Sequence, residues 1–309
     1  MEAAVVGLRW VQYAASFVLT GGALFALYAL PARGPSSAAA LAWPRQVLAG
    51  SAAILVLATA LGLLAQTAVV AGSLSAALDP TTLASVLTDM AMGPSSVARG
   101  VCAALALGLL LGVRPGVPAW VASSSLGAVA TASLAWMGHG AATEGAGALV
   151  HLAADLAHLA AAAVWTGAIV FFLILARFAD STDADGLEAF HGALAGFSGV
   201  GSALVAVLLA TGLINSGFLV GVAGLPSLLA TLYGRLLLLK LLVFVAMLAL
   251  AAANRFRLTP ALRGGLEDPD RSAAAIAALR KSLALEAGAA LAVLALVAWL
   301  GRLAPIFSL

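Results

Sequence analysis

The sequence predicts an all-α membrane protein, a bundle of about eight transmembrane helices with both termini outside. Hydrophobic residues occupy 63% of the 309 positions and charged residues only 9%, whereas a soluble domain is about half apolar and a quarter charged. Too few polar side chains remain to cover a soluble core of this size. The apolar residues also come in runs of about 20, the length at which a helix crosses the hydrocarbon core of a bilayer.

Eight such runs predict the helices in order along the chain. We expect helices at roughly 8–30, 47–70, 96–113, 118–137, 149–177, 192–220, 234–254 and 282–303. Asp79, Asp89 and Pro94 interrupt the approach to the third span, so 80–92 is a candidate short interfacial helix. The polar stretch 254–272 has the proline, glycine and charge content of a solvated link. It bounds no soluble domain, so residues 1–309 are expected to form a single membrane domain.

The basic residues predict the orientation of the bundle. An even number of spans puts both termini on one side of the membrane, and loops rich in lysine and arginine stay in the cytoplasm. One side carries Arg33, Arg45, Arg114, Arg177, Arg255, Arg257, Arg263, Arg271, Arg280 and Lys281, and the other carries Arg9, Arg99, Arg235, Lys240 and Arg302. The first set is the larger, so we expect it in the cytoplasm, with both termini facing the periplasm.

One predicted span, 149–177, carries ionisable side chains on one face. His151, Asp155 and His158 recur at i, i+4 and i+7, the spacing that aligns side chains on a helix. Such groups in a span cost about 2.5–3.5 kcal/mol each on insertion scales and are usually functional. Helical rise separates the two histidines by roughly 10 Å, too far to grip one ion easily. We therefore expect a depth-ordered series: an outer site of His139 and His151, Asp155 able to pair with either histidine, and an inner step at His158.

These residue types are typical of a path for a transition metal. Imidazole and carboxylate groups suit ions such as Cu(II) or Zn(II), whereas thioethers select Cu(I). Met90, Met92 and Met137 lie on the predicted outward side. Their alternative role is interfacial packing, so the oxidation state of the metal stays open.

The remaining composition excludes several classes of protein. The single cysteine, Cys102, rules out an intramolecular disulfide and any multi-cysteine metal cluster. The sequence has no phosphate-binding P-loop, no G-x-S-x-G nucleophile and no HExxH motif. We therefore expect neither an enzyme nor an ATP-driven pump. The formal charge of +2 is too small to predict a nucleic-acid partner.

Other polar residues lie inside the predicted spans. Lys240 and Glu286 differ in depth by about two helical turns, so we expect no direct salt bridge between them. Lys240 is expected to reach outward, and Glu286 to neighbour Asn254, Arg255 or Arg280. Asn215, near the outer end of its span, either lines a cavity or bonds a neighbouring helix.

Two blocks of sequence carry a family resemblance. Block 138–167 contains Gly138-His139, His151-x3-Asp155-x2-His158 and Trp165-x-Gly167. Block 197–286 contains Phe197-Ser198, Thr211-Gly212, Tyr233-Gly234-Arg235-Leu236-x3-Lys240-Leu241, Asn254-Arg255 and Arg280-x-Ser282-x3-Glu286. In these blocks the chain resembles the copper resistance protein D (CopD) family of bacterial inner-membrane proteins.

The resemblance implies a function for these residues. It implies that the chain binds copper ions and imports them across the inner membrane to the cytoplasm, with His139, His151, Asp155 and His158 handling the metal. It also implies a periplasmic CopC-like copper donor. The sequence shows no CopC-like β domain at either end, so we expect that donor to be a separate protein.

Two alternatives remain at this stage. Paired membrane histidines can also be the axial ligands of a b-type haem in an electron-transfer protein. That arrangement needs histidines on facing helices at matched depth, which only His139 with His151 or His158 offers. In the third hypothesis the bundle is an assembly partner whose histidines form hydrogen bonds only.

Overall fold

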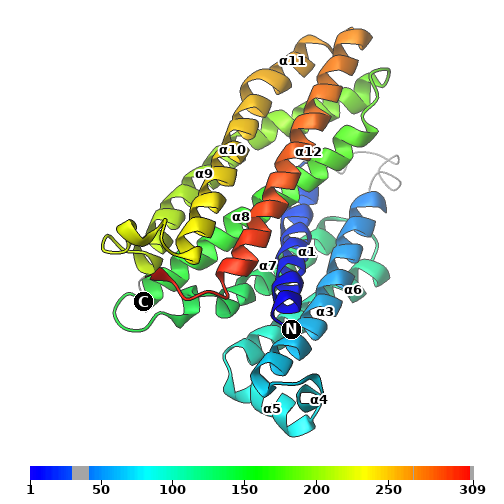
Figure 1. Cartoon of the computed structure of the whole chain (residues 1–309). Coiled ribbons are helices and arrows are strands. Elements are labelled where there is room, and N and C mark those ends of the chain that lie inside the picture. Colours follow the sequence, from blue (N-terminus) through cyan, green and yellow to red (C-terminus); the bar gives the residue numbers. More distant parts are fainter. Residues whose placement is uncertain (30–41, 267, 307–309) are drawn as a thin grey trace.

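The computed structural model describes residues 1–29, 42–266 and 268–306. Within these ranges every regular element is helical. Eight of the described helices are long and apolar enough to cross a membrane, and Figure 1 shows them packed side by side in one bundle. The predicted all-α polytopic fold is confirmed.

The long helices follow the predicted spans and are longer than expected, except for the span predicted at 118–137, whose last turn is a separate 3₁₀ helix. They are α1 (Glu2–Tyr28), α3 (Ala42–Ala71), α6 (Met92–Gly112), α7 (Val117–Ala132), α8 (Ala148–Phe178), α9 (Ala184–Leu219), α10 (Leu232–Ala253) and α12 (Pro269–Leu300). The shorter elements are α4 (Leu74–Ala77), α5 (Pro80–Asp89), η1 (Ser133–Met137), η2 (Gly140–Ala142), η3 (Leu225–Ser227), η4 (Asn254–Leu258) and α11 (Thr259–Gly264). The short helix expected at 80–92 is α5. Its start is set by Asp79, whose side chain accepts a hydrogen bond from the backbone N–H of Thr82.

The stretch 254–272, expected to be a solvated link, is helical for most of its length, although many of its side chains are exposed as expected. The π-helix η4 continues α10 without a break, α11 follows it, and α12 already begins at Pro269. The side chain of Asp268 accepts hydrogen bonds from the backbone N–H groups of Asp270 and Arg271. An aspartate N-cap followed by proline is a strong helix start, so the local capping chemistry outweighs the polar composition.

Helix α1 lies in the middle of the bundle and fixes the position of α8. It packs against α3, α7, α8 and α12. At the crossing of α1 and α8, a Cβ atom on Gly167 would overlap the backbone of Gly21, so the two helix backbones touch. Such close approach through small residues is a common way to pack membrane helices. Helices α9 and α10 lie at the periphery, where α9 packs on α8 and α10 packs on α12.

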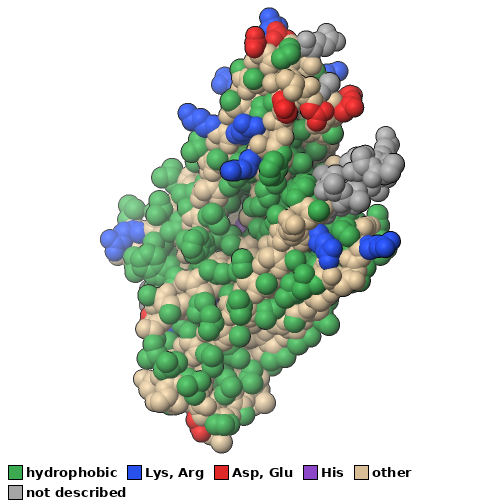
Figure 2. Space-filling model, turned by 90° about the vertical axis from the view of Figure 1, so that its right-hand side faces the viewer, with side chains coloured by type: hydrophobic (Ala, Val, Ile, Leu, Met, Phe, Trp, Pro, Cys, Tyr) green, Lys and Arg blue, Asp and Glu red, His purple; other side chains and the backbone are tan. Residues whose placement is uncertain are grey.

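All described connections gather at the two ends of the bundle (Figure 1). We call the end that holds residue 1, the connections 72–91, 138–147 and 220–231, and residues 301–306 the terminal end. The opposite end holds the connections 113–116 and 179–183 together with η4 and α11, and we call it the charged end. Figure 2 shows a hydrophobic belt around the middle and a concentration of acidic and basic side chains toward the upper end. The pattern is that of a bundle with its middle in lipid.

Two basic residues counted for the orientation lie inside the protein. Arg9 on α1 is 2% exposed and Arg99 on α6 is 0% exposed, so neither of them lies in a solvated loop. Arg99 donates hydrogen bonds to Oε1 of Gln12 at 2.6 Å and to the hydroxyl and carbonyl of Ser133. These neutral oxygens solvate the guanidinium where water is excluded.

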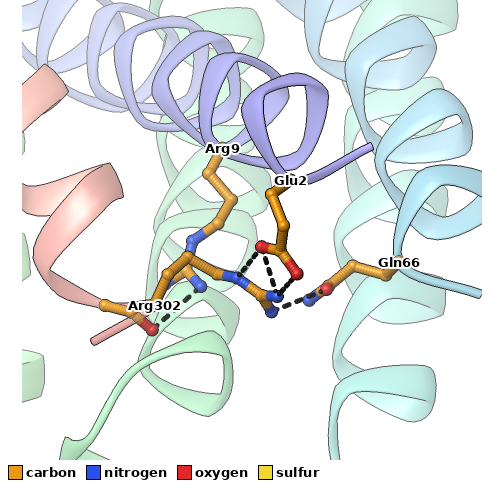
Figure 3. Close-up of polar contacts among 5 residues, drawn as sticks. Glu2, Arg9, Gln66 and Arg302 are labelled. Atoms are coloured by element: carbon orange, nitrogen blue, oxygen red, sulfur yellow. Dashed lines mark hydrogen bonds and ion pairs between the residues drawn. The ribbon is translucent and has the colours of Figure 1, made fainter. Parts of the chain in front are cut away.

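Arg9 forms hydrogen bonds both to the connection after α7 and to the segment after α12. It donates to the carbonyl of Met137 at 2.6 Å and to that of Gly301 at 3.2 Å. Figure 3 shows the neighbouring contacts, in which Arg302 pairs with Glu2 and bonds Gln66. The first and last spans are thus joined at the terminal end, beside the connection that carries His139.

Candidate functional site

The predicted row of ionisable side chains lies on α8 and faces α9. Nδ1 of His158 is 2.8 Å from Oγ1 of Thr211. Seven residues earlier on α8, the ring of His151 stacks on Phe218 with 4.7 Å between ring centroids and 5° between ring planes. Because the two helices run antiparallel, these two contacts fix their register.

That register places Asn215 opposite the middle of the row. Asn215 lies one turn after Thr211 and one turn before Phe218, so it is level with the stretch between His158 and His151. Its Oδ1 atom is buried and has no hydrogen-bond partner. Sequence alone left Asn215 undecided between a cavity position and an interhelical bond. Its Oδ1 atom makes no interhelical bond.

His151 is less accessible than expected. The prediction put it at the outer surface with His139, but its side chain is only 1% exposed. Phe218 covers the face of the ring, and the hydroxyl of Thr143 lies 2.6 Å from Nδ1. The residue is in the first turn of α8, at the terminal end, with its imidazole enclosed.

The hydrogen bonds of His158 determine which ring nitrogen is available. The hydroxyl of Thr211 donates to the carbonyl of Val207 at 2.6 Å, so its oxygen is left to accept from Nδ1–H of a neutral His158. The other nitrogen, Nε2, then keeps its lone pair. A histidine that binds metal usually donates its second ring nitrogen to a fixed oxygen in this way. Thr211-Gly212 was visible in the sequence, but only as part of the family pattern.

Asp155 on α8 has two neighbouring features, the connection 138–147 that precedes this helix and Lys240 on α10. A Cβ atom on Gly140 would collide with the Asp155 carboxylate, so the connection carrying His139 rests directly on this side chain. Lys240 interacts electrostatically with Asp155 and with His158. Its charge therefore acts on groups of α8, and the expectation that its side chain reaches toward the outer side stays a prediction. The two charges stay apart by more than the ion-pair distance, since the described ranges contain close pairs only at Arg271–Asp268 and Arg302–Glu2.

His139 lies outside the spans, between η1 and η2. Its Nε2 atom is 3.4 Å from the carbonyl oxygen of Leu300, and its ring centroid is 6.3 Å from that of Tyr233. Burial lowers the pKa of His139 below the ordinary value of 6.5, with a smaller contribution from the positive charge of Arg9. Its imidazole is therefore neutral at neutral pH, the form that binds metal ions.

The three predicted methionines lie at the terminal end as well. Met90 follows α5 and is 37% exposed, Met92 begins α6, and Met137 ends η1, two residues before His139. The partly buried side chain of Met137 packs against a core cluster that contains Tyr13 and Leu159. Packing is therefore part of the role of Met137, while Met90 is open to the surface.

The described side chains do not form one preassembled ion cage. Among them, no group of three or more histidine, cysteine, aspartate or glutamate residues is close enough to hold a metal ion. Three of the four predicted site residues, His151, Asp155 and His158, instead follow one another along α8. The fourth, His139, lies in the connection 138–147 that precedes this helix.

A second polar group lies nearer the charged end. Trp165 Nε1 donates to Oε1 of Glu286 at 3.0 Å, and Asn254 Nδ2 donates to Oε2 at 2.9 Å. The prediction that Asn254 is a neighbour of Glu286 is confirmed. Trp165 appeared in the sequence as part of the family pattern, and its partner on α12 could not be predicted from spacing.

Comparisons with known proteins identify relatives over most of the chain. Residues 1–150 match the family model "Copper resistance protein D-like, N-terminal domain", and residues 191–300 match the model "Copper resistance protein D". His151, Asp155 and His158 fall between the two matched ranges. The predicted single membrane domain stays a prediction.

Individual relatives agree with these matches. Copper resistance protein D of Pseudomonas syringae pv. tomato is 33% identical over 302 residues, covering 97% of this chain and 96% of the relative. Inner membrane protein YebZ of Escherichia coli (strain K12) is 33% identical over 145 residues, 45% of each chain. No solved structure matches. Together with the eight apolar helices, these relatives identify a copper-related, multi-pass inner-membrane protein. The chain belongs to the copper resistance protein D family.

Proposed function

We propose that this chain binds copper ions and carries them across the inner membrane from the periplasm to the cytoplasm. In this proposal the terminal end faces the periplasm, as the loop charges predict, and copper is the cargo of a transporter that catalyses no reaction. The alternative with a b-type haem has no support from the relatives, none of which is named as a haem protein.

The observation that carries the proposal is the 2.8 Å contact between Nδ1 of His158 and Oγ1 of Thr211, whose hydroxyl donates to Val207. In the tautomer that this contact favours, Thr211 accepts from Nδ1–H and Nε2 is left as a ligand inside the bundle. Asp155 lies one turn away on the same face and Asn215 faces it from α9. Imidazole with carboxylate or amide oxygen is a donor set that suits Cu(II), and His139 with Met137 adds softer donors at the outer end.

Lys240 gives this row a means to release its ion. In the absence of copper, its ammonium group compensates the Asp155 carboxylate at a distance longer than a close ion pair. An arriving copper ion competes with Lys240 for that carboxylate. Because the two cations repel each other, the site binds the ion weakly enough to let it move on, as conduction requires.

The outer end of the path suits a protein donor. Met90 is exposed, and the connection 138–147 presents His139 next to Met137 at the same end of the bundle. A separate CopC-like periplasmic protein is the partner that we propose for this surface. Transfer between thioether and imidazole ligands then needs no free copper in solution.

Cellular copper accumulation tests the proposal. We expect His151→Ala and His158→Ala to abolish accumulation in cells that depend on this protein, while both variants insert in the membrane at normal levels. His191→Ala on α9, outside the row, is the matched control and should accumulate copper normally. Unchanged accumulation in both row variants would contradict the proposed path.

A further inference from the structure

Glu286 is a second buried acid, and the copper path described above does not use it. It lies on α12 and is 3% exposed. Its two oxygens accept hydrogen bonds from Trp165 on α8 and Asn254 at the start of η4. Both donors are neutral, and Glu286 takes part in none of the close ion pairs in the described ranges. A carboxylate held this way in a span is costly unless it has a function.

A cavity connects Glu286 with the charged end. It has a volume of about 310 Å³, and its walls come from α8, α9, α10, η4, α11 and α12. The polar atoms at its floor belong to Glu286, Trp165 and Asn254, and Arg255 with Thr259 lies on the η4–α11 side. Arg255 is the only other charged or titratable side chain in the lining, and its guanidinium donates to the hydroxyl of Ser202.

Two buried oxygen atoms without a hydrogen-bond partner belong to residues near Glu286. Oδ1 of Asn254 is buried without a hydrogen-bond partner, although the side chain lines the cavity and the residue is only 8% exposed. Oγ of Ser282, one turn before Glu286 on α12, is also buried without a partner. Buried polar atoms are normally satisfied, so these two oxygens mark a place where a proton donor is expected at some stage.

The amide of Asn254 can serve both protonation states of Glu286. In the structure, the Nδ2–H group of Asn254 donates to Oε2 of Glu286, the contact that suits an ionised carboxylate. After a rotation of the amide by half a turn, Oδ1 can accept from the O–H of a protonated carboxyl group. The residue begins the π-helix η4, in which the N–H of Thr259 bonds the carbonyl of Asn254. Single π-helical turns of this kind occur frequently at functional sites.

The position of Glu286 relates it to the row on α8. Trp165 follows His158 by seven residues, which is roughly 10 Å further toward the charged end on the same helix face. No imidazole, thiol or thioether lines the cavity, so its donor set does not suit a soft copper ion. A buried carboxyl group with which no cation of the described residues pairs closely, in a cavity that extends to the charged end, suits a proton.

We propose that Glu286 binds and releases a proton through this cavity during the transport cycle, so that copper movement is coupled to protons at the charged end. The inference rests on the proposed transport function for the coupling, but proton binding at Glu286 stands by itself. The proton moves between water at the charged end and a carboxylate oxygen of Glu286, with no change in redox state. Trp165 links the carboxyl group to α8, because its hydrogen bond weakens when Oε1 loses negative charge.

Infrared difference spectroscopy on the purified full chain tests proton binding directly. A change of pH should produce a carbonyl band of a protonated carboxyl group in the wild type, and exchange into D₂O should shift it. Glu286→Gln, which keeps the shape and the oxygen that Trp165 bonds, should lose the band, whereas Asp155→Asn should retain it. A band that is unchanged in Glu286→Gln, or a wild type without such a band at any pH, would overturn the proposal.

Copper uptake into proteoliposomes then tests the coupling. Wild-type uptake should change with the pH on the charged-end side, and Glu286→Gln should lose that dependence. If Glu286→Gln keeps the pH dependence of the wild type, the coupling is refuted. If the wild type moves no copper while the infrared band of Glu286 is present, the transport function fails and proton binding remains. Trp165→Phe, which removes one donor without touching the acid, should shift the pH at which the band appears.

Discussion

Nδ1 of His158 lies 2.8 Å from Oγ1 of Thr211, and Thr211 gives its own proton to the carbonyl of Val207. These two hydrogen bonds favour the tautomer of His158 in which Nε2 keeps its lone pair. In the proposed copper path, Thr211 on α9 would therefore position a ligand atom of His158 on α8.

Removing that hydroxyl should weaken copper binding. Thr211→Val keeps the volume but leaves Nδ1 without an acceptor, so the ring can turn or change tautomer. We expect copper affinity to fall about 10- to 100-fold, the range seen for partners of metal-binding histidines. Thr211→Ser, which restores a hydroxyl, is the control and should stay near wild type. Competition with a chromophoric chelator measures both affinities, and equal values for the valine variant would refute the tautomer argument.

The contact between Gly140 and Asp155 predicts a steric effect. A methyl group at position 140 would meet the Asp155 carboxylate, whereas a Cβ atom on Gly138 would find its nearest neighbour at 3.8 Å. Gly140→Ala should therefore displace Asp155 or the connection above it and reduce copper uptake severalfold. Gly138→Ala serves as the matched control and should transport normally. Uptake assays in cells distinguish the two, and a normal Gly140→Ala variant would show that this close packing is irrelevant.

The charge of Lys240 should oppose copper at the middle of the path. Lys240→Met removes a cation that interacts with both Asp155 and His158. We expect tighter copper binding and slower release, while Lys240→Arg keeps the charge and should bind copper as the wild type does. Equilibrium binding and efflux from loaded proteoliposomes measure the two effects. Weaker binding in Lys240→Met would contradict the role proposed for this lysine.

The pKa of His139 predicts the pH dependence of the outer site. Burial lowers this pKa below 6.5, so the neutral ring persists at pH values where an exposed histidine is already half protonated. Copper binding that depends on His139 should hold at pH 6.5 and decrease only as the pH falls through the lower pKa of the folded protein. The stability contributed by the neutral ring has the same sign: it is present above pH 6.5 and lost below the folded pKa. Binding curves of wild type and His139→Ala should therefore converge at low pH, and convergence already above pH 6.5 would disagree.

Arg99 should be important for stability. Arg99→Met leaves Oε1 of Gln12 and the polar groups of Ser133 without their buried donor, at about 1–3 kcal/mol for each unsatisfied group. Thermal unfolding in detergent should show a clear decrease in melting temperature. Arg271→Ala, at a side chain that is 76% exposed, should change the free energy of unfolding by less than about 0.5 kcal/mol. Equal melting temperatures for the two variants would contradict this assignment.

The sequence could predict the spans and the row on α8 because both depend on local periodicity. Runs of apolar residues mark helices, and the spacing of His151, Asp155 and His158 marks one face. Which helix meets that face is a tertiary property, so the pairing of His158 with Thr211 and the covering of His151 by Phe218 were not predictable. The enclosure of Arg9 and Arg99 inside the bundle was not predictable for the same reason. A count of charges along the chain does not show that carbonyl groups from distant segments solvate a buried guanidinium.

The central claim is that Asp155 and the histidines beside it conduct copper. Copper uptake into proteoliposomes, compared between wild type and Asp155→Asn, tests it most directly. The asparagine keeps the shape of the side chain and removes the negative charge for which Lys240 and copper compete. We expect the wild type to take up copper and Asp155→Asn to do so about tenfold more slowly or worse, since even indirect partners of a metal cost that much. Equal uptake by both proteins, or none above empty liposomes for the wild type, would contradict the proposed path.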